Sequence, residues 1–378
     1  MKPVHDNKRF TQLDALRGAA ALSVVFFHYL TRLKITEQEI NFFGSLSEKL
    51  MYIMKYTPLR IIWLGHEAVI LFFVLSGFVM SLSLFSRHKP TYSTYLVKRI
   101  CRIYIPYVVT ILFAILLKKL SYSGEIPALS TAFNNAWQIP DNECRAILSH
   151  LALIGDFDTN IYDGSIWSLV HEMRISLIFP LLVGTYKNTR AAPSLLTAFL
   201  PSFIAYFIIQ YNMSVSSLVM TIHYTGLFLF GTIIAKYRYR LINSTKKFSD
   251  IKMLILLFAA SLIYAFSAWS LSFAPEIIHD WISAVGTALF IILLMSWDKA
   301  IRLFQNKAFV FLGRISYSLY LWHIVILNTL IHGLYGIYPL FVIYLTAFAV
   351  TIFISWISHK YIELPSMKLG KILTGTNK

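Results

Sequence analysis

Long apolar stretches alternate with short polar segments along the whole chain. Because an α-helix rises 1.5 Å per residue, a run of about twenty apolar residues can cross the roughly 30 Å hydrocarbon core of a bilayer. The pattern predicts ten such helices, near residues 15–33, 61–85, 103–119, 166–187, 192–212, 216–237, 251–271, 279–297, 309–332 and 339–361. An even number of crossings places both termini on the same side of the membrane.

The distribution of positive charge predicts which side this is. Of the 34 Lys and Arg residues, 23 fall in the tails and loops on the side of the termini, and 8 fall on the other side. Basic loops collect on the cytoplasmic face of membrane proteins, so both termini are predicted to be cytoplasmic. The remaining three arginines, Arg17, Arg174 and Arg314, lie within the predicted helices.

Composition agrees with this pattern. The 378 residues are 57% hydrophobic and 14% charged, whereas a soluble domain usually carries about 25% charged residues. We therefore predict one all-α integral membrane domain over residues 1–378, with its helices at about 15–361 and no separate soluble domain. The net charge of +16 is explained by basic loops that fix topology and meet anionic lipid, so a nucleic-acid partner is not expected.

A long loop at about 120–165 is predicted to lie outside. Its stretch CRAILSHLALIG is too short to span a bilayer and is predicted to be re-entrant or interfacial. Cys101 and Cys144 fall on opposite sides of this topology, so no disulfide is expected between them. The chain shows no cysteine spacing of the zinc-binding type, and no metal site is expected.

The first predicted helix, LDALRGAAALSVVFFHY, carries two polar side chains that are unfavourable in a bilayer. Arg17 and His28 are eleven residues apart, so they lie on one stripe of the helix, about 16 Å apart along its axis. An arginine at the centre of a membrane helix raises the free energy of membrane insertion by about 2.5–3.5 kcal/mol. Arg17 alone is equally well explained by a side chain that reaches the headgroups, but the pair on one stripe favours a functional role.

Two further helices carry charged residues at helical spacing. In YLVKRICRIYIPY, Arg99 and Arg102 share a face, which suits a phosphate group as well as it suits anchoring to the cytoplasmic surface. In IWSLVHEMRISLIFP, Ser168 and Glu172 share a face near the outer end. The predicted depth of Glu172 matches that of His28, so the carboxylate is expected to orient this imidazole as a general base. A structural ion pair is the alternative for Glu172.

Two other helices add candidate contacts. In GHEAVILFFVLSGFVMS, Ser76 and the following glycine permit close approach to a neighbouring helix or a ligand. In LGRISYSLYLWH, His323 lies at the predicted depth of His28, and several polar side chains precede it along the helix. These side chains either line a cavity shared with His28 or join helix to helix: Arg314, Ser316, Tyr320 and His323.

Taken in order, these motifs resemble those of the membrane acyltransferase family 3. The resemblance rests on R-x10-H at Arg17 and His28, FFVLSGF in the second helix, R-x-x-R at Arg99 and Arg102, WSLxxE ending at Glu172, the LGRISYSLYLWH stretch and the tail YIELPSMKLGK. It extends over about residues 10–370. One departure is HEAV before LFFVLSGF, where the family pattern would have something closer to a glycine-valine pair.

The resemblance implies an O-acyltransferase, by default an O-acetyltransferase, of the plasma (inner) membrane of a bacterium. It implies that acetyl-CoA or another acyl-CoA enters from the cytoplasm as donor substrate, with no permanently bound cofactor, and that a carbohydrate or glycolipid hydroxyl is the acceptor. His28 and Glu172 would be catalytic, and Arg17, Arg99 and Arg102 would bind the donor phosphates. Ser76, Ser168, Arg314, Ser316, Tyr320 and His323 would contact the acceptor or the oxyanion.

Two other classes of function stay open from the residues alone. A transporter would use His28, Glu172 and Arg17 as a proton or ion relay. We see no internal repeats and no clearly broken pair of helices, which disfavours this class. A purely structural protein would leave the polar residues at matching depths unexplained. The sequence does not identify the acceptor, the acyl group or the oligomeric state.

Overall fold

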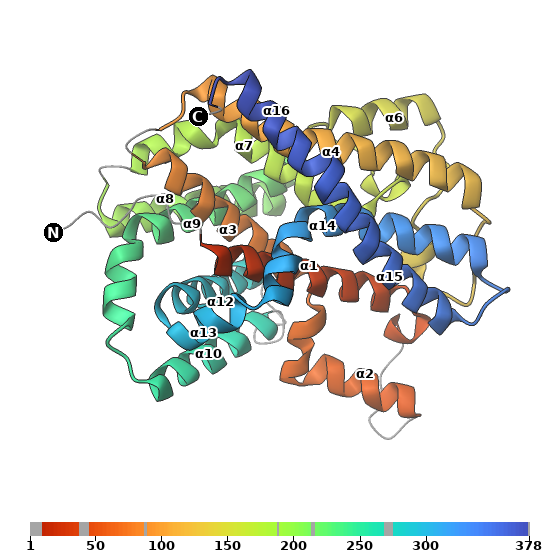
Figure 1. The fold of residues 1–378 in the computed structure, drawn as a ribbon, viewed down its shortest axis with the longest axis horizontal. Helices are drawn as coiled ribbons and strands as arrows, with labels where there is room; N and C mark the ends of the chain where they lie inside the picture. Colours follow the sequence, from red (N-terminus) through yellow and green to blue (C-terminus); the bar gives the residue numbers. More distant parts are fainter. Residues whose placement is uncertain are drawn as a thin grey trace. The chain divides into compact units, whose positions relative to one another are not determined.

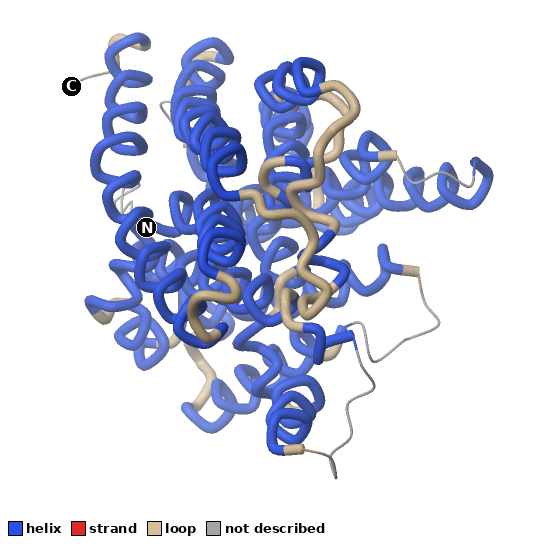
Figure 2. The backbone as a smooth tube through the Cα atoms, turned by 90° about the vertical axis from the view of Figure 1, so that its right-hand side faces the viewer, coloured by secondary structure: helices blue, strands red, loops and turns tan. Residues whose placement is uncertain are grey.

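The computed structural model describes residues 10–37, 45–86, 89–186, 189–212, 216–267 and 275–376. All regular elements in these ranges are helices, and the described backbone shows no strand (Figure 2). The predicted all-α class is therefore confirmed for the part of the chain that the structure describes.

The described residues include ten helices of 16 to 30 residues (Figure 1). They are α1 (Thr11–Thr31), α3 (His66–Leu84), α4 (Tyr92–Ser121), α7 (Trp167–Tyr186), α8 (Ala191–Asn212), α9 (Ser217–Thr245), α10 (Asp250–Ala265), α12 (Glu276–Ser296), α14 (Lys307–Leu334) and α15 (Leu340–Ser358). Shorter helices lie between or after them: α2 (Leu46–Tyr56), α5 (Thr131–Asn134), α6 (Glu143–Ala152), α13 (Asp298–Phe304) and α16 (Leu364–Leu373).

Nine helices of the described chain are long and apolar enough to cross a membrane. The tenth predicted span, 251–271, is occupied by α10, which has 16 residues, and residues 268–274 lie outside the described chain. The largest difference is in α4, which begins at Tyr92 and not near residue 103. Its first turns contain Lys98, Arg99 and Arg102, which lower the hydropathy but are good helix formers.

The chain forms two compact units, each assembled from three separate segments. The first unit contains residues 1–20, 66–93 and 174–314, and the second contains residues 21–65, 94–173 and 315–378. Helices α1, α4, α7 and α14 contribute residues to both units, so neither unit corresponds to one half of the sequence.

In the first unit, α3 and α9 approach each other until their backbones touch. A Cβ atom added to Gly77 would lie 2.0 Å from the carbonyl oxygen of Phe228, and one added to Gly231 would lie 2.0 Å from that of Val74. Such small residues let helices pack closely where apolar burial gives no net advantage over lipid. The glycine in the FFVLSGF motif is thereby explained as a packing position.

Four helices of the first unit are joined through one buried carboxylate. Asp280 of α12 accepts hydrogen bonds from Nε2 of His66 on α3 at 2.6 Å and from Nε2 of His223 on α9 at 3.0 Å. Nδ1 of His223 meets the hydroxyl of Ser202 on α8 at 2.9 Å, and that hydroxyl also accepts from Trp281 at 2.9 Å. His66, which belongs to the HEAV segment that departs from the family pattern, therefore has a structural partner in Asp280.

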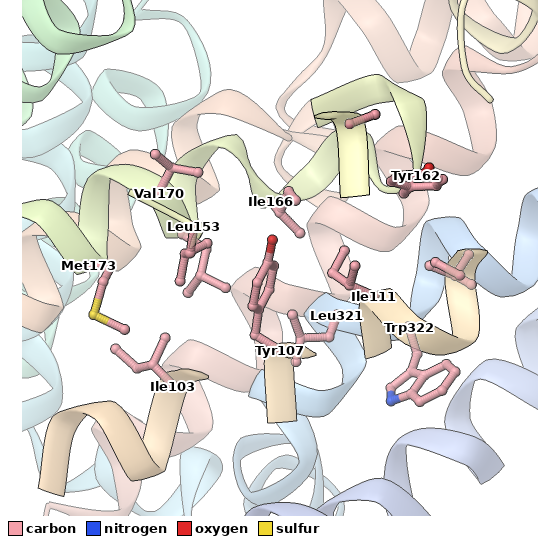
Figure 3. Close-up of a cluster of buried hydrophobic side chains, with 14 of the residues drawn as sticks. Ile103, Tyr107, Ile111, Leu153, Tyr162, Ile166, Val170, Met173, Leu321 and Trp322 are labelled. Carbon is pink, nitrogen blue, oxygen red and sulfur yellow. The ribbon is translucent and has the colours of Figure 1, made fainter. Parts of the chain in front are cut away.

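The second unit contains a buried hydrophobic cluster around Tyr107 of α4, which Figure 3 shows with residues of α7 and α14. The loop predicted at 120–165 packs into this cluster through Trp137, Leu153 and Tyr162, all of which are buried. The indole of Trp137 donates to the carbonyl of Tyr162 at 2.8 Å. The CRAILSHLALIG stretch forms the ten-residue helix α6, so its prediction as a segment too short to span is confirmed.

At the C-terminal end, α15 continues through a π-helical turn at His359–Glu363 into α16. The three elements form one rod over Leu340–Leu373, drawn in dark blue in Figure 1. Pro365 stands in the first turn of α16, directly after this π-helical turn, and has no N–H to donate to the preceding turn.

The contact between α3 and α9 predicts a strong effect of adding one methyl group. Gly77→Ala and Gly231→Ala should each lower the thermal stability of the purified protein, because the new Cβ would force the two backbones apart. Gly184→Ala in α7 is the matched control, since an added Cβ there has no neighbour within 4 Å. It should leave the melting temperature unchanged or slightly raised, because alanine is about 0.8–1 kcal/mol better than glycine in a helix. Equal melting temperatures for all three variants would contradict this packing.

Candidate active site

Two imidazoles lie together in the second unit. The ring centroids of His28 on α1 and His323 on α14 are 5.2 Å apart. The ring of His323 is fully buried, and its Nδ1 lies 2.7 Å from the carbonyl oxygen of Tyr320. Because a carbonyl only accepts, Nδ1 carries the hydrogen of the neutral ring and Nε2 is left as an acceptor. This Nε2 is buried and has no hydrogen-bond partner among the described residues.

Arg32 is buried four residues beyond His28, at the end of α1. The loop before α5 fixes it there. The backbone N–H of Ser130 donates to the carbonyl of Arg32 at 3.1 Å, and the Ser130 hydroxyl donates to the carbonyl of Thr31 at 2.7 Å. The guanidinium donates to the carbonyl of Ala132. Its charge is close enough to act on His28, His323 and Asp163.

Asp163 supplies a buried carboxylate to the same region. Its Oδ1 accepts from the backbone N–H of Ser165 at 3.0 Å and from the Ser165 hydroxyl at 2.7 Å, whereas Oδ2 has no partner among the described residues. Burial raises the pKa of Asp163 to about 7, although the hydrogen bonds from Ser165 and the charge of Arg32 oppose this rise. Burial lowers the pKa of Arg32 to about 10, so the guanidinium stays charged at neutral pH.

The sequence predictions omitted Arg32, at the outer end of the first predicted helix, and Asp163, in the predicted outer loop at 120–165. A signal existed for Arg32 only, because a residue four positions after His28 lies on the same helical face. Nothing in the sequence around Asp163 distinguishes it from the other acids of the long loop, since its burial depends on packing between distant segments.

Ser168 and Tyr320, both predicted to contact the acceptor or oxyanion, bond to each other. Their hydroxyl oxygens are 2.7 Å apart, and the hydroxyl of Tyr320 also donates to the carbonyl of Ser165. Both side chains are buried. These contacts attach the segment that carries Asp163 to the segment of α14 that carries His323, so the structure gives the two hydroxyls a positioning role.

Glu172 has a different partner from the one expected. It accepts a hydrogen bond from the guanidinium of Arg99, and the two side chains are 22% and 11% exposed. The expected pairing with His28 is thus replaced by an ion pair between α7 and α4. The physical reason is the early start of α4, which places Arg99 about two turns inside that helix. Arg102 follows one turn later and is partly buried.

The remaining predicted residues fall in both units. In the first unit, Arg17 of α1 forms an ion pair with Asp14 at 3.5 Å. Gly18, next to Arg17, contacts the backbone of α14, because a Cβ added to Gly18 would lie 2.4 Å from the backbone nitrogen of Gly313. Arg314, which follows Gly313, is exposed. Ser76 of the first unit is partly buried, and Ser316 of the second is buried. Their roles toward donor or acceptor stay predictions.

The closing E-x-P motif has a structural role in the second unit. The carboxylate of Glu363 is buried and accepts from the hydroxyl of Ser318 on α14 at 3.0 Å and from Nδ1 of His359 at 3.0 Å. This contact ties the C-terminal rod to the helix that carries His323. Among the described residues, no group of three or more His, Cys, Asp or Glu side chains is placed to hold a metal ion.

Comparison with known proteins identifies the family. Residues 10–360 match the model of the acyltransferase domain of acyltransferase family 3. The chain belongs to this family. A 71-residue stretch is 38% identical to proteins of Staphylococcus aureus strains COL, MSSA476 and MRSA252, whose names assign them provisionally as O-acetyltransferases. This stretch is 18% of the chain and 11% of each relative, so the match spans about a tenth of their length. No solved structure matches the chain.

For this acyltransferase-family protein, the buried carboxyl predicts an unusual response of stability to pH. A carboxyl whose pKa is higher in the folded state favours folding at low pH, and this contribution is lost as pH rises from about 4 to about 7. Asp163→Asn replaces the carboxyl with a neutral amide, so this decrease in the free energy of unfolding does not occur. The variant should therefore melt several degrees above the wild type at pH 8 in detergent and show little gain at pH 4. Asp141→Asn, at an exposed acid of the same loop, is the control and should change neither value. A lower melting temperature for Asp163→Asn at pH 8 would contradict the assigned burial.

Proposed function

We propose that the protein is a membrane O-acyltransferase that moves an acyl group, in the simplest case acetyl, from acyl-CoA to a hydroxyl of a carbohydrate or glycolipid. The observation that carries the proposal is the pair of imidazoles at His28 and His323, one with a buried nitrogen that accepts a proton or a hydrogen bond. The family membership and the names of the staphylococcal relatives support the type of reaction.

In this proposal His28 is the general base. Its imidazole takes the proton of the acceptor hydroxyl while the oxygen attacks the carbonyl carbon of the thioester. When the tetrahedral intermediate collapses, the C–S bond breaks and the proton passes to the thiolate, so the products are an ester and free coenzyme A. General-base help of this kind is typically worth about 10²–10⁴-fold in rate. His323 accepts a hydrogen bond through Nε2 and holds the acceptor.

The donor phosphates are assigned to Arg99 and Arg102 of the second unit. Guanidinium groups bind phosphate oxygens with paired, charge-assisted hydrogen bonds. Glu172 bonds to Arg99, so we assign it the role of holding this guanidinium in place rather than that of orienting His28. The entry of the donor from the cytoplasm follows from the predicted topology, in which the first turns of α4 face that side.

The base assignment predicts that His28→Ala abolishes transfer. Purified full-length protein in nanodiscs would be supplied with labelled acetyl-CoA and with alkyl glycosides, and ester formation would be measured. The variant should fall at least 100-fold because no other group takes the proton. His279→Ala, at a partly buried histidine of α12, is the control and should retain activity. Full activity of His28→Ala would refute the assignment, and no transfer by the wild type to any glycoside would refute the proposed acceptor class.

The contact between Glu172 and Arg99 predicts that substitutions at either residue change KM and leave kcat nearly unchanged. Glu172→Gln and Arg99→Ala should each raise the KM for acetyl-CoA about 10- to 100-fold, the effect of a lost charge-assisted hydrogen bond, with kcat nearly unchanged. Glu143→Gln breaks the exposed pair with Lys119, whose atoms are 3.0 Å apart, and should alter neither constant. A large fall in kcat at constant KM for Glu172→Gln would instead assign this carboxylate to the base.

A further inference from the structure

Eleven buried side-chain atoms of the second unit have no hydrogen-bond partner among the described residues, and three of them belong to one group of interacting charges. These three atoms are Nε of Arg32, Oδ2 of Asp163 and Nε2 of His323. Their side chains are 5%, 0% and 0% exposed. Buried polar groups in proteins are almost always paired, so each exception needs a physical explanation.

The three groups belong to one site because independent contacts bring their segments together. Ser130 attaches the end of α1, with Arg32, to the segment at α5, and Trp137 of that segment donates to the carbonyl of Tyr162, next to Asp163. Tyr320 attaches the segment of Asp163 to α14, three residues before His323. The charge of Arg32 acts on both Asp163 and His323. Nevertheless, Nε of Arg32 and Oδ2 of Asp163 each have no hydrogen-bond partner among the described residues.

The chemistry of the three atoms defines what fits between them. Nε of Arg32 donates one hydrogen bond, whereas Oδ2 of Asp163 and Nε2 of His323 accept. A hydroxyl group both donates and accepts, so two neighbouring hydroxyls satisfy all three atoms. When Asp163 is ionised its charge offsets that of Arg32, so the pair gives neither an anion nor a cation a net attraction. The arrangement therefore selects a neutral ligand with at least two hydroxyl groups.

We propose that Arg32, Asp163 and His323 form the subsite that binds the acceptor, and that this acceptor carries neighbouring hydroxyls, as a sugar ring does. One hydroxyl bridges Arg32 and Asp163, and the next donates to Nε2 of His323, 5.2 Å by ring centroid from His28. The proposal assigns the residues that bind the acceptor of the proposed reaction and rests on that reaction for the step at His28, but the binding that it requires is independent of catalysis.

Direct binding tests the subsite. Full-length protein in nanodiscs would be titrated with methyl glycosides of glucose, galactose, mannose and N-acetylglucosamine, and with the mono-alcohol tetrahydropyran-2-methanol. Saturation-transfer NMR would give the Kd of each. We expect Asp163→Asn, Arg32→Gln and Arg32→Lys to raise the Kd of a bound glycoside about 10- to 100-fold and to leave the weaker Kd of the mono-alcohol within about twofold. Asp141→Asn and Arg145→Gln, at exposed positions of the same unit, should change neither.

The outcomes separate this inference from its alternatives. Glycoside binding that is unchanged in Asp163→Asn and in Arg32→Lys overturns the subsite, as does a wild type that binds no glycoside. If the pair only stabilises the fold, the variants would lower the melting temperature and weaken both classes of ligand equally. Selective loss of glycoside binding in variants that melt at or above the wild-type temperature supports the subsite. If the wild type binds a glycoside but transfers no acetyl group to it, the proposed function fails while the subsite stands.

Discussion

A guanidinium and a carboxylate are buried beside two imidazoles, and the second unit is organised around keeping these charges in place. Arg32 is held by the backbone of the loop at residues 130–132, and Asp163 is held by Ser165. That loop is in turn fixed by the packing of Trp137 and Tyr162 around Tyr107. Buried charge is tolerated only where the surroundings supply hydrogen bonds, so the apolar cluster and the polar site depend on each other.

The energetics of this arrangement differ from those of an ordinary stabilising ion pair. Burial moves the pKa of Asp163 from 3.8 to about 7, which means that the folded state resists the ionised form. A group that destabilises the fold at neutral pH and lies next to candidate catalytic residues is typical of a functional site, where stability is given up for chemistry. By contrast, Asp280 of the first unit has both carboxylate oxygens occupied by histidines and joins helices instead.

The two arginine-containing motifs also have distinct physical roles. R-x10-H places Arg17 in the first unit and His28 in the second, both on the continuous helix α1. R-x-x-R lies within α4, where Arg99 is paired with Glu172. The pair neutralises an arginine that would be unfavourable in an apolar setting and fixes its direction, which the proposed binding of donor phosphates requires. Thus WSLxxE and R-x-x-R, far apart in sequence, act together through one contact.

The amino-acid sequence by itself determined the helical class, nearly all helix positions and the presence of His28 and His323 as polar residues in apolar helices. These features are local, because a bilayer demands long apolar runs and makes every polar exception stand out. Tertiary structure alone decided that Glu172 pairs with Arg99, that Asp163 is buried and that Glu363 binds Ser318. Side-chain partners depend on which helix faces approach each other, and loop residues become buried only through packing of distant segments, neither of which is encoded in periodicity.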